Sequence, residues 1–280
     1  MTVGTPLDRL RELPTGPGRV PVTWFGQAGF ALRSSTATVV IDPFLSPHEA
    51  RLYESNQPPT ATTGVDLLLC SHEHLDHFDP DGAPSIAKAS PGATVVVPAP
   101  IVDMVTEAGI PPDRVLGVQP GEVHELNGIA IRPIPARHGV TMEDAYGFGE
   151  ELSGGQIRFV GFVLEMDGVR IYHAGDTIHY VGMEATLVAH RPHVALLPIN
   201  GRHAERESRG IIGNLNEYEA AWLAATIGAE TLIPMHHDLF ARNLGSAARV
   251  VEAAAEEERA VTVVVPSRET PFVVTAGSDR

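Results

Sequence analysis

The chain has 280 residues, of which 43% are hydrophobic, and it carries a formal net charge of −15 with a pI near 5.2. This length and content suffice to bury the core of one large domain, which we expect to span residues 1–280. Because the charge is strongly negative, we expect neither long nucleic acids nor anionic membranes among the partners, since both are held through clustered lysines and arginines.

Targeting and membrane signals are not found in the sequence. The first residues lack a basic stretch followed by an apolar one, and no later run holds about eighteen uninterrupted apolar residues. The single cysteine, Cys70, rules out an internal disulfide and fits a reducing compartment. We therefore expect a soluble, cytoplasmic protein. The oligomeric state stays open, and a homo-oligomer is one alternative.

Short apolar segments separated by turn residues predict strands along the whole chain. In chain order they cover residues 22–25, 30–32, 38–41, 67–70, 94–97, 115–118, 129–131, 162–165, 169–172, 194–198, 231–234, 261–265 and 272–274. Helical periodicity occurs at 101–108, 183–189, 217–227 and 247–258. Asn216 and Glu219 form a capping-box pattern before the third helix, and Gly228 ends it.

The strands fall into two long runs, each followed by helices, and we find no sharp sequence repeat. This order predicts an α/β protein in which two sheets face each other with helices outside, a four-layer αββα sandwich rather than a doubly wound parallel sheet. Two long segments, residues 139–159 and 201–213, interrupt the pattern. They are candidate lids over a site; the alternative is surface excursions without a role.

The most informative segment is residues 71–79, which hold three histidines and several carboxylates directly after a predicted buried strand. A hydrophobic core has no use for such a cluster, so it indicates a metal site. In a loop, His72 and His74 can point the same way, while Asp76 and His77 can face a second centre. One segment can thus supply ligands to two ions, and the spacing favours a dinuclear site.

Such a site needs about two or three more nitrogen or oxygen donors, because Zn²⁺ takes about four ligands and Mn²⁺ or Fe²⁺ more. Three further predicted strands each end near a suitable side chain: His138, Asp176 and His236. Each alone has an ordinary structural explanation, but four clusters at strand ends together favour a shared metal centre. Adjacent side chains on an extended segment point opposite ways, so we expect His236, rather than His237, to reach the ion.

The order of these residues resembles the metallo-β-lactamase superfamily, and Asp42 in Ile41-Asp42-Pro43 matches its usual early aspartate. Segments 22–26, 175–177, 209–213 and 233–238 resemble, more specifically, the L-ascorbate-6-phosphate lactonase branch. The similarity runs from about Val22 to Leu244. The resemblance implies an αββα sandwich and a hydrolase with two divalent metal ions, Mn²⁺ or Zn²⁺, with Fe²⁺ suited to the same ligands. In the named branch, the reaction opens a phosphorylated sugar-acid lactone.

The resemblance also implies roles for the ligands. One ion is held by His72, His74 and His138, the other by Asp76, His77 and His236, and Asp176 bridges the two. A hydroxide shared by the ions attacks the lactone carbonyl. Asp76, or otherwise Asp176, returns a proton to the leaving oxygen as the catalytic acid; the alternative is that both are ligands only.

Other polar residues are assigned supporting roles. Asp42 and Asp79 are expected to orient ligand histidines, with an exposed loop position as the alternative for Asp79. Arg202, Arg206 and Arg209 lie in one segment, and Arg137 directly precedes His138, so they are candidate binding groups for a phosphate or carboxylate. The alternative is a solvated loop in which arginines and glutamates neutralise one another. Three further substrate-binding candidates are Asn200, His179 and His237, each with a purely structural position as its alternative.

The sequence thus predicts a metal-dependent, lactonase-like hydrolase that acts on a small anionic substrate. A phosphodiesterase of the same fold acting on a small phosphodiester is the first alternative, because dinuclear sites also perform that chemistry. A non-catalytic metal-binding protein is a second, disfavoured because every predicted ligand is present. An oxygen-reducing di-iron role is a third, but that branch carries a carboxylate where His74 stands.

Overall fold

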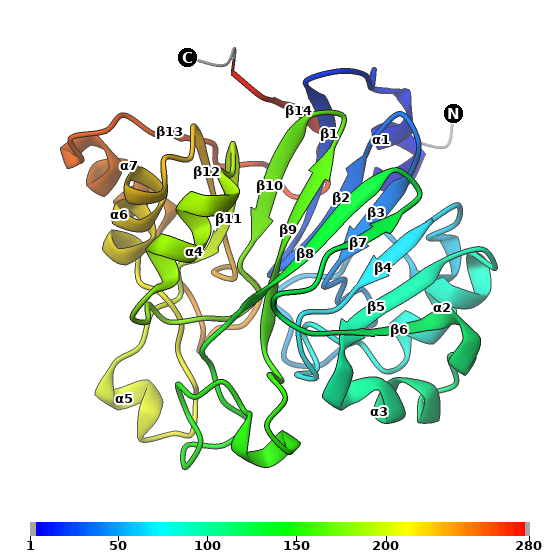
Figure 1. Ribbon diagram of the computed structural model, residues 1–280, viewed down its shortest axis with the longest axis horizontal. Coiled ribbons are helices and arrows are strands. Elements are labelled where there is room, and N and C mark those ends of the chain that lie inside the picture. Colours follow the sequence, from blue (N-terminus) through cyan, green and yellow to red (C-terminus); the bar gives the residue numbers. More distant parts are fainter. Residues whose placement is uncertain (1–3, 278–280) are drawn as a thin grey trace.

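The computed structural model describes residues 4–277, which form two seven-stranded mixed sheets packed face to face (Figure 1). Each sheet contains parallel and antiparallel pairs. The first sheet has the spatial order β14 (Phe272–Thr275), β1 (Arg19–Gly26), β2 (Gly29–Arg33), β3 (Thr38–Ile41), β4 (Leu67–Leu69), β5 (Thr94–Pro98) and β6 (Val115–Val118). The second has the order β13 (Thr262–Val263), β12 (Thr231–Met235), β11 (Val194–Pro198), β10 (Val169–His173), β9 (Val160–Met166), β8 (Ile129–Pro135) and β7 (His124–Leu126).

The two sheets share one topology. In the first, β14, β1, β2 and β3 pair antiparallel, and β3 to β6 pair parallel. In the second, β7 to β10 pair antiparallel, and β10 to β13 pair parallel. The last strand of the chain therefore completes the first sheet beside β1. The halves repeat in structure although their sequences show no sharp repeat, because topology constrains hydrophobic pattern far more than residue identity.

Helices flank both sheets. On the side of the first sheet lie α1 (Pro6–Glu12), α2 (Gly82–Ala89) and α3 (Val102–Glu107); beside the second lie α4 (Met183–His190), α6 (Glu217–Ile227) and α7 (Ala247–Glu256) (Figure 1). The short α5 (Ala204–Glu207) lies in a loop, and short 3₁₀ turns cover Pro59–Ala61, Ala99–Ile101, Pro112–Arg114 and Glu151–Ser153. The predicted αββα sandwich is confirmed. None of the helices described here is long and apolar enough to cross a membrane.

The core consists of one large apolar cluster that includes the space between the sheets, a second between the first sheet and its helices, and a small third one between α6 and α7. Strand β4 shows how the first two are filled: Leu67 and Leu69 join the first cluster, and Leu68 joins the second. All three are completely buried. Burial of each such leucine contributes about 1.5–3 kcal/mol to stability. A strand that is buried on both faces needs apolar side chains at every position, and its sequence is therefore a continuous apolar run.

Most predicted elements are confirmed, and α6 has the predicted capping box and glycine end. Asn216 accepts hydrogen bonds from the backbone amides of Tyr218 and Glu219, and Gly228 adopts a left-handed conformation. The expected order of strand runs followed by helices was wrong, because the parallel half of each sheet requires crossovers and helices therefore alternate with strands there. The predicted strand at 261–265 is reduced to β13.

Candidate metal centre

A tight turn after β4 carries four of the clustered side chains. The backbone amides of His77 and Phe78 both donate to the carbonyl of His74, at 2.9 and 2.8 Å. This turn folds the loop back on itself. The ring of His72 consequently lies between those of His74 and His77, with ring centroids 4.6 and 4.0 Å away.

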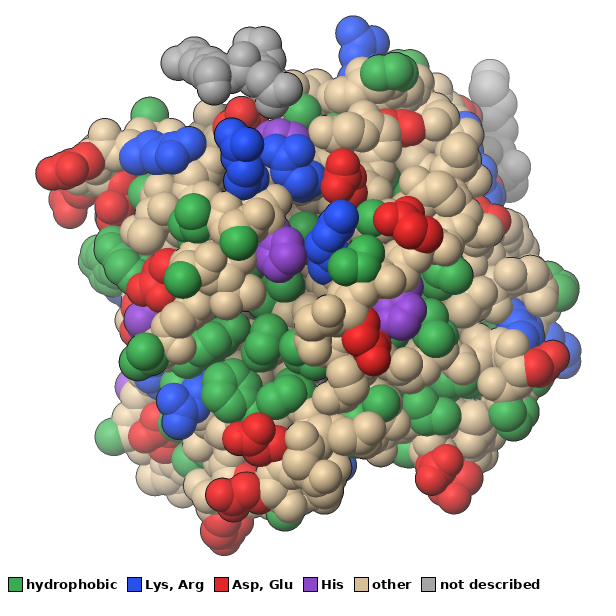
Figure 2. Space-filling view, viewed as in Figure 1, with side chains coloured by type: hydrophobic (Ala, Val, Ile, Leu, Met, Phe, Trp, Pro, Cys, Tyr) green, Lys and Arg blue, Asp and Glu red, His purple; other side chains and the backbone are tan. Residues whose placement is uncertain are grey.

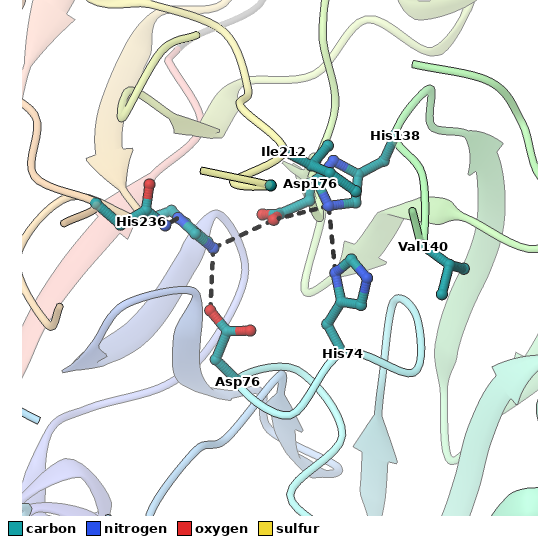
Figure 3. Close-up of a pocket in the computed structure, with 9 residues that line it drawn as sticks. His74, Asp76, His138, Val140, Asp176, Ile212 and His236 are labelled. Carbon is teal, nitrogen blue, oxygen red and sulfur yellow. Dashed lines mark hydrogen bonds and ion pairs between the residues drawn. The ribbon is translucent and has the colours of Figure 1, made fainter. Parts of the chain in front are cut away.

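Three other strand ends meet this loop. His138 follows β8, Asp176 follows β10, and His236 directly follows β12. Figure 3 shows Asp176 and His138 facing His74 across the pocket, with His236 approaching Asp76 from another side. The structure thus brings together all seven side chains that the sequence pattern singled out as ligands.

The seven side chains form two groups, and within each group the candidate ligand atoms all lie within 4.8 Å of one another. One group is His72, His74, His138 and Asp176; the other is Asp76, His77 and His236. Asp176 also reaches the second group, because its Oδ1 lies 3.3 Å from Nε2 of His77 and its Oδ2 lies 3.2 Å from Nε2 of His236. It therefore occupies the place that a bridging ligand would take.

The spacing of these atoms fits two divalent ions. Donors about 2.1 Å from a tetrahedral ion stand about 3.4 Å apart, and Asp176 lies 3.2, 3.3 and 3.4 Å from His236, His77 and His138. Nε2 of His77 and Oδ1 of Asp176 are buried and make no hydrogen bond. Buried polar atoms without hydrogen bonds are costly, so two such atoms only 3.3 Å apart indicate that a cation can bind between them.

The electrostatics of the two groups differ. Burial lowers the pKa of His72 well below its ordinary value and that of His138 to about 3, so both imidazoles keep a free lone pair. Burial also disfavours protonation of His236, but Asp176 and Asp76 outweigh it and raise its pKa to about 9. The two carboxylates thus favour positive charge at this place, whether a proton or a metal ion supplies it.

Asp42 orients one of the clustered histidines. Its Oδ2 lies 2.7 Å from Nδ1 of His77, and its Oδ1 accepts a hydrogen bond from the amide of Ser71 at 2.7 Å. The carboxylate and the imidazole are both completely buried. Because Nδ1 is occupied, Nε2 of His77 faces Asp176, which is how carboxylates commonly orient metal-binding histidines. The contact expected for Asp42 is therefore present.

The corresponding expectation for Asp79 was wrong. Its carboxylate accepts hydrogen bonds from the backbone amides of Leu45, Ser46 and Gly82, and none from a histidine in the described part of the chain. It therefore holds the loop after β3 against the start of α2. The sequence near Asp79 cannot tell whether the carboxylate orients a histidine or binds backbone amides, because either role places it beside the cluster.

Gln27, in the turn between β1 and β2, is a site residue that the sequence analysis missed. Its Nε2 donates to Oδ2 of Asp76 at 2.7 Å and lies 3.1 Å from Nε2 of His236. Its carbonyl accepts the amide of His236 at 2.8 Å. Its backbone is left-handed, with φ of 50°. The only local signal is a glutamine between glycines, Gly26 and Gly29, in an otherwise apolar hairpin.

A chain of side-chain amides ends at the ring of His236. Asn214 donates to Asn200 at 3.0 Å, Asn200 donates to Asn243 at 2.5 Å, and Nδ2 of Asn243 lies 3.4 Å from Nδ1 of His236. Asn200 was expected to bind substrate. It instead supports Asn243, which lines the pocket and which the sequence analysis did not identify.

The pocket over the metal centre has a volume of about 160 Å³. Its lining residues are His74, Asp76, His138, Val140, Asp176, Gly210, Ile212, His236 and Asn243. Six of these residues are polar, namely the five from the two clusters and Asn243, and Val140, Gly210 and Ile212 come from the two long segments. Within residues 4–277, no lysine or arginine lines it.

The expected substrate role of the three loop arginines is not supported. Arg202 makes two hydrogen bonds of 2.9 Å to the carboxylate of Glu219. Arg206 donates to two backbone carbonyls, and Arg209 forms an exposed pair with Glu205 at 2.9 Å. Each of the three guanidinium groups is thus bound to an acceptor that is not part of the pocket lining.

Three other candidates also lie outside the pocket lining. Arg137 is exposed. Nε2 of His179 lies 2.8 Å from Glu184. His237 stacks on Trp24, with ring centroids 5.3 Å apart. His237 therefore belongs to the wall behind the site, and the expectation that only His236 of the adjacent pair reaches the cluster agrees with the structure.

Comparison with known proteins decides the family. Residues 37–237 match the model described as the beta-lactamase superfamily domain. A UPF0173 metal-dependent hydrolase from Methanoculleus marisnigri is 32% identical over 234 residues, which cover 82% of this chain and 88% of that protein. The chain belongs to the UPF0173 metal-dependent hydrolases of the metallo-β-lactamase superfamily. A UPF0173 relative from Archaeoglobus fulgidus is 30% identical over 219 residues, covering 78% of this chain and 84% of that protein.

Solved structures support the same fold for this UPF0173 hydrolase. The metallo hydrolase Igni18 from Ignicoccus hospitalis covers 91% of this chain and 98% of its own, with a TM-score of 0.67 and 22% identity. An isothiocyanate hydrolase from Delia radicum gut bacteria covers 91% of this chain and all of its own, with a TM-score of 0.72 and 18% identity. The UPF0173 relatives are named for metal dependence and hydrolysis alone, so the lactonase branch is not shown.

Proposed function

We propose that this UPF0173 hydrolase opens a small lactone that carries no phosphate. The observation that carries the proposal is the composition of the pocket lining: nitrogen and oxygen donors from the metal centre, the uncharged Val140, Gly210 and Ile212, and no lysine or arginine among the described residues. A neutral ring compound suits such a lining, because its carbonyl can face the polar donors while its carbon atoms contact Val140 and Ile212.

The phosphorylated substrate that the resemblance implied loses its support. A phosphate is usually bound through arginine or lysine, and no such side chain in the described chain lines the pocket. The described lining offers a small phosphodiester no lysine or arginine either, so the alternative reaction would depend on the metal ions alone to bind the phosphate.

In this proposal, His72, His74 and His138 would hold one divalent ion and Asp76, His77 and His236 the other, with Asp176 between them. Bound there, such ions supply Lewis acidity, which makes water a nucleophile near neutral pH and polarises a carbonyl. The protein holds its donors in place through Asp42, Gln27 and the amide chain. Because the donors are preorganised, little reorganisation is needed when charge develops.

We assign proton transfer to Asp76. Its side chain is 17% exposed, against 5% for Asp176, and both line the pocket. Oδ2 of Asp76 is occupied by Gln27 and His236, whereas its other oxygen points away from His236 (Figure 3). That oxygen is placed to carry a proton to the alkoxide that leaves when the ring opens.

Hydrolysis of an isothiocyanate is a second candidate. An isothiocyanate, like a neutral lactone, is a small, uncharged electrophile. The isothiocyanate hydrolase from Delia radicum gut bacteria has a similar structure, with a TM-score of 0.72. The identity of 18% supports the fold alone, so the pocket lining is the argument for this substrate class as well.

The test is to prepare the protein with Zn²⁺, Mn²⁺ or Fe²⁺ and assay each form against lactones, isothiocyanates, thioesters and phosphodiesters. We expect lactone opening by at least one metal form and a loss of about 100-fold or more in Asp76→Asn, the range for removal of an acid–base group. The Glu122→Gln variant, which changes an exposed carboxylate, serves as the control. Activity confined to phosphodiesters, or lactone opening unchanged in Asp76→Asn, would contradict the proposal.

A further inference from the structure

A second groove, of about 480 Å³, lies on the outer face of the second sheet. Four basic residues line it, namely Arg132, Arg170, His190 and Arg191, together with one carboxylate, Glu165. None of its lining residues lines the pocket of the metal centre. Figure 2 shows lysine and arginine side chains gathered in the upper part of this face, over the region of β8 to β10 in Figure 1.

The strand register builds the floor of the groove. Arg170 on β10 pairs with Glu165 on β9, and Arg132 on β8 pairs with Val163 on β9. Paired residues on neighbouring strands point to the same face, and so do residues two apart along one strand. All four side chains therefore lie on one face. The end of α4 adds His190 and Arg191 as a wall.

The positive charges of the groove are only partly neutralised. Nη1 of Arg132 lies 3.4 Å from Glu165, and these side chains are 25% and 41% exposed, so the pair is weak. Nε of Arg170 donates to the carbonyl of Arg191 at 2.7 Å, which fixes the guanidinium in place. The Arg191 side chain is exposed, and its guanidinium makes no hydrogen bond or ion pair with any residue in 4–277. Burial, and then the charge of Arg132, lower the pKa of His190, which leaves this imidazole neutral.

Three guanidinium groups and one carboxylate leave a net charge of about +2 in the groove, within a chain whose net charge is −15. We propose that this groove binds the phosphate group of a small molecule. A phosphate carries a charge of about −1.5 to −2 near pH 7, which matches the groove. Arginine side chains also bind phosphate oxygens in pairs through their planar donors.

The test is to titrate the metal-loaded, full-length protein with inorganic phosphate and with pyrophosphate at constant ionic strength, using calorimetry and amide NMR shifts. We expect saturable binding, with shifts confined to β8–β10 and the end of α4. The Arg191→Gln variant should weaken binding about 10-fold or more, because a charge-assisted hydrogen bond is lost. Glu165→Gln should instead tighten it, because the opposing carboxylate is removed and Arg132 is released.

Arg249→Gln is the matched control, because Arg249 is an exposed arginine on α7. It should leave binding unchanged, and thermal unfolding of each variant reports whether the fold is retained. Phosphate that binds at the metal centre would keep its affinity in Arg191→Gln, and this result would overturn the proposal. Equal affinity for succinate would also overturn it, because the groove would then not select phosphate.

Discussion

The hydroxyl of Tyr146 donates a hydrogen bond of 2.7 Å to Oε1 of Glu207 and thereby joins the two long segments that border the pocket. The first segment, residues 139–159, contributes Val140 to the pocket lining, and the second, residues 201–213, contributes Ile212. The candidate lids are therefore in contact with each other beside the metal centre.

Tyr146→Phe should loosen both segments without unfolding the protein. One lost hydrogen bond is worth about 0.5–1.5 kcal/mol, so we expect KM to rise by about 2- to 12-fold with a smaller change in kcat. Limited proteolysis should cut within 139–159 and 201–213 faster than in the wild type. Tyr218→Phe, which changes an exposed tyrosine on α6, is the control. Unchanged cleavage rates would show that the contact does not restrain the segments.

Asp42→Asn should weaken metal binding by about 10- to 100-fold, because the ring of His77 loses the carboxylate that orients it. Competition with a chelator, read by released metal, measures this. Asp79→Asn is the matched control, since Asp79 is also buried but contacts backbone amides. It should lower the melting temperature and leave metal affinity unchanged. Equal losses of affinity in both variants would refute the specific role of Asp42.

Asn243→Leu should also weaken metal binding, by about 10-fold, because the ring of His236 loses the amide beside its Nδ1. The same chelator competition applies, with metal release followed for each variant. Arg242→Leu, at the exposed neighbouring position, should behave as the wild type. If Asn243→Leu keeps full affinity and full activity, the amide chain is only a packing feature.

Glu219→Gln should reduce stability at neutral pH but not in acid. Burial raises the pKa of Glu219, but Arg202 and the Asn216 amide outweigh it, and the net pKa is lowered from 4.5. The ionised carboxylate therefore stabilises the folded state above pH 4.5, and this contribution is lost as the pH falls through the lower, folded-state value. We expect a difference of at most about 1 kcal/mol at pH 7, because the pair is partly exposed.

Urea unfolding of the wild type and Glu219→Gln at pH 7 and pH 3 measures this difference. The difference should shrink toward zero at the lower pH. A difference that is constant across this range would mean that the glutamate acts by packing rather than by charge.

Local pattern predicts strands and capped helices well in this chain, and it fails where tertiary contacts decide. Strand β7 was missed because it is a short edge strand with partly exposed residues. Helix α2 was missed because Gly82 and Pro84 in its first turn weaken the helical pattern. Helix α1 was missed despite the capping box of Thr5 and Asp8, because its apolar face is only two turns long.

The candidate ligands could be predicted because they are rare residue types concentrated at strand ends, where the fold of the backbone alone brings them together. Gln27 and Asn243 could not, because one polar residue in a turn carries no local sign of what it contacts. The arginines show the opposite failure. The type of Arg137, Arg202, Arg206 and Arg209 suggested phosphate binding, but Arg202 is held by Glu219 and none of the four lines the pocket.

The sequence by itself determined the layered fold and the seven donors, because hydrophobic periodicity and residue chemistry are local properties of the chain. Only the tertiary structure decided which polar residues support those donors, and that no lysine or arginine among the described residues lines the pocket. Those features depend on distances between residues far apart in the chain, such as Asp42 to His77 and Gln27 to Asp76, and these distances exist only once the two sheets have packed together.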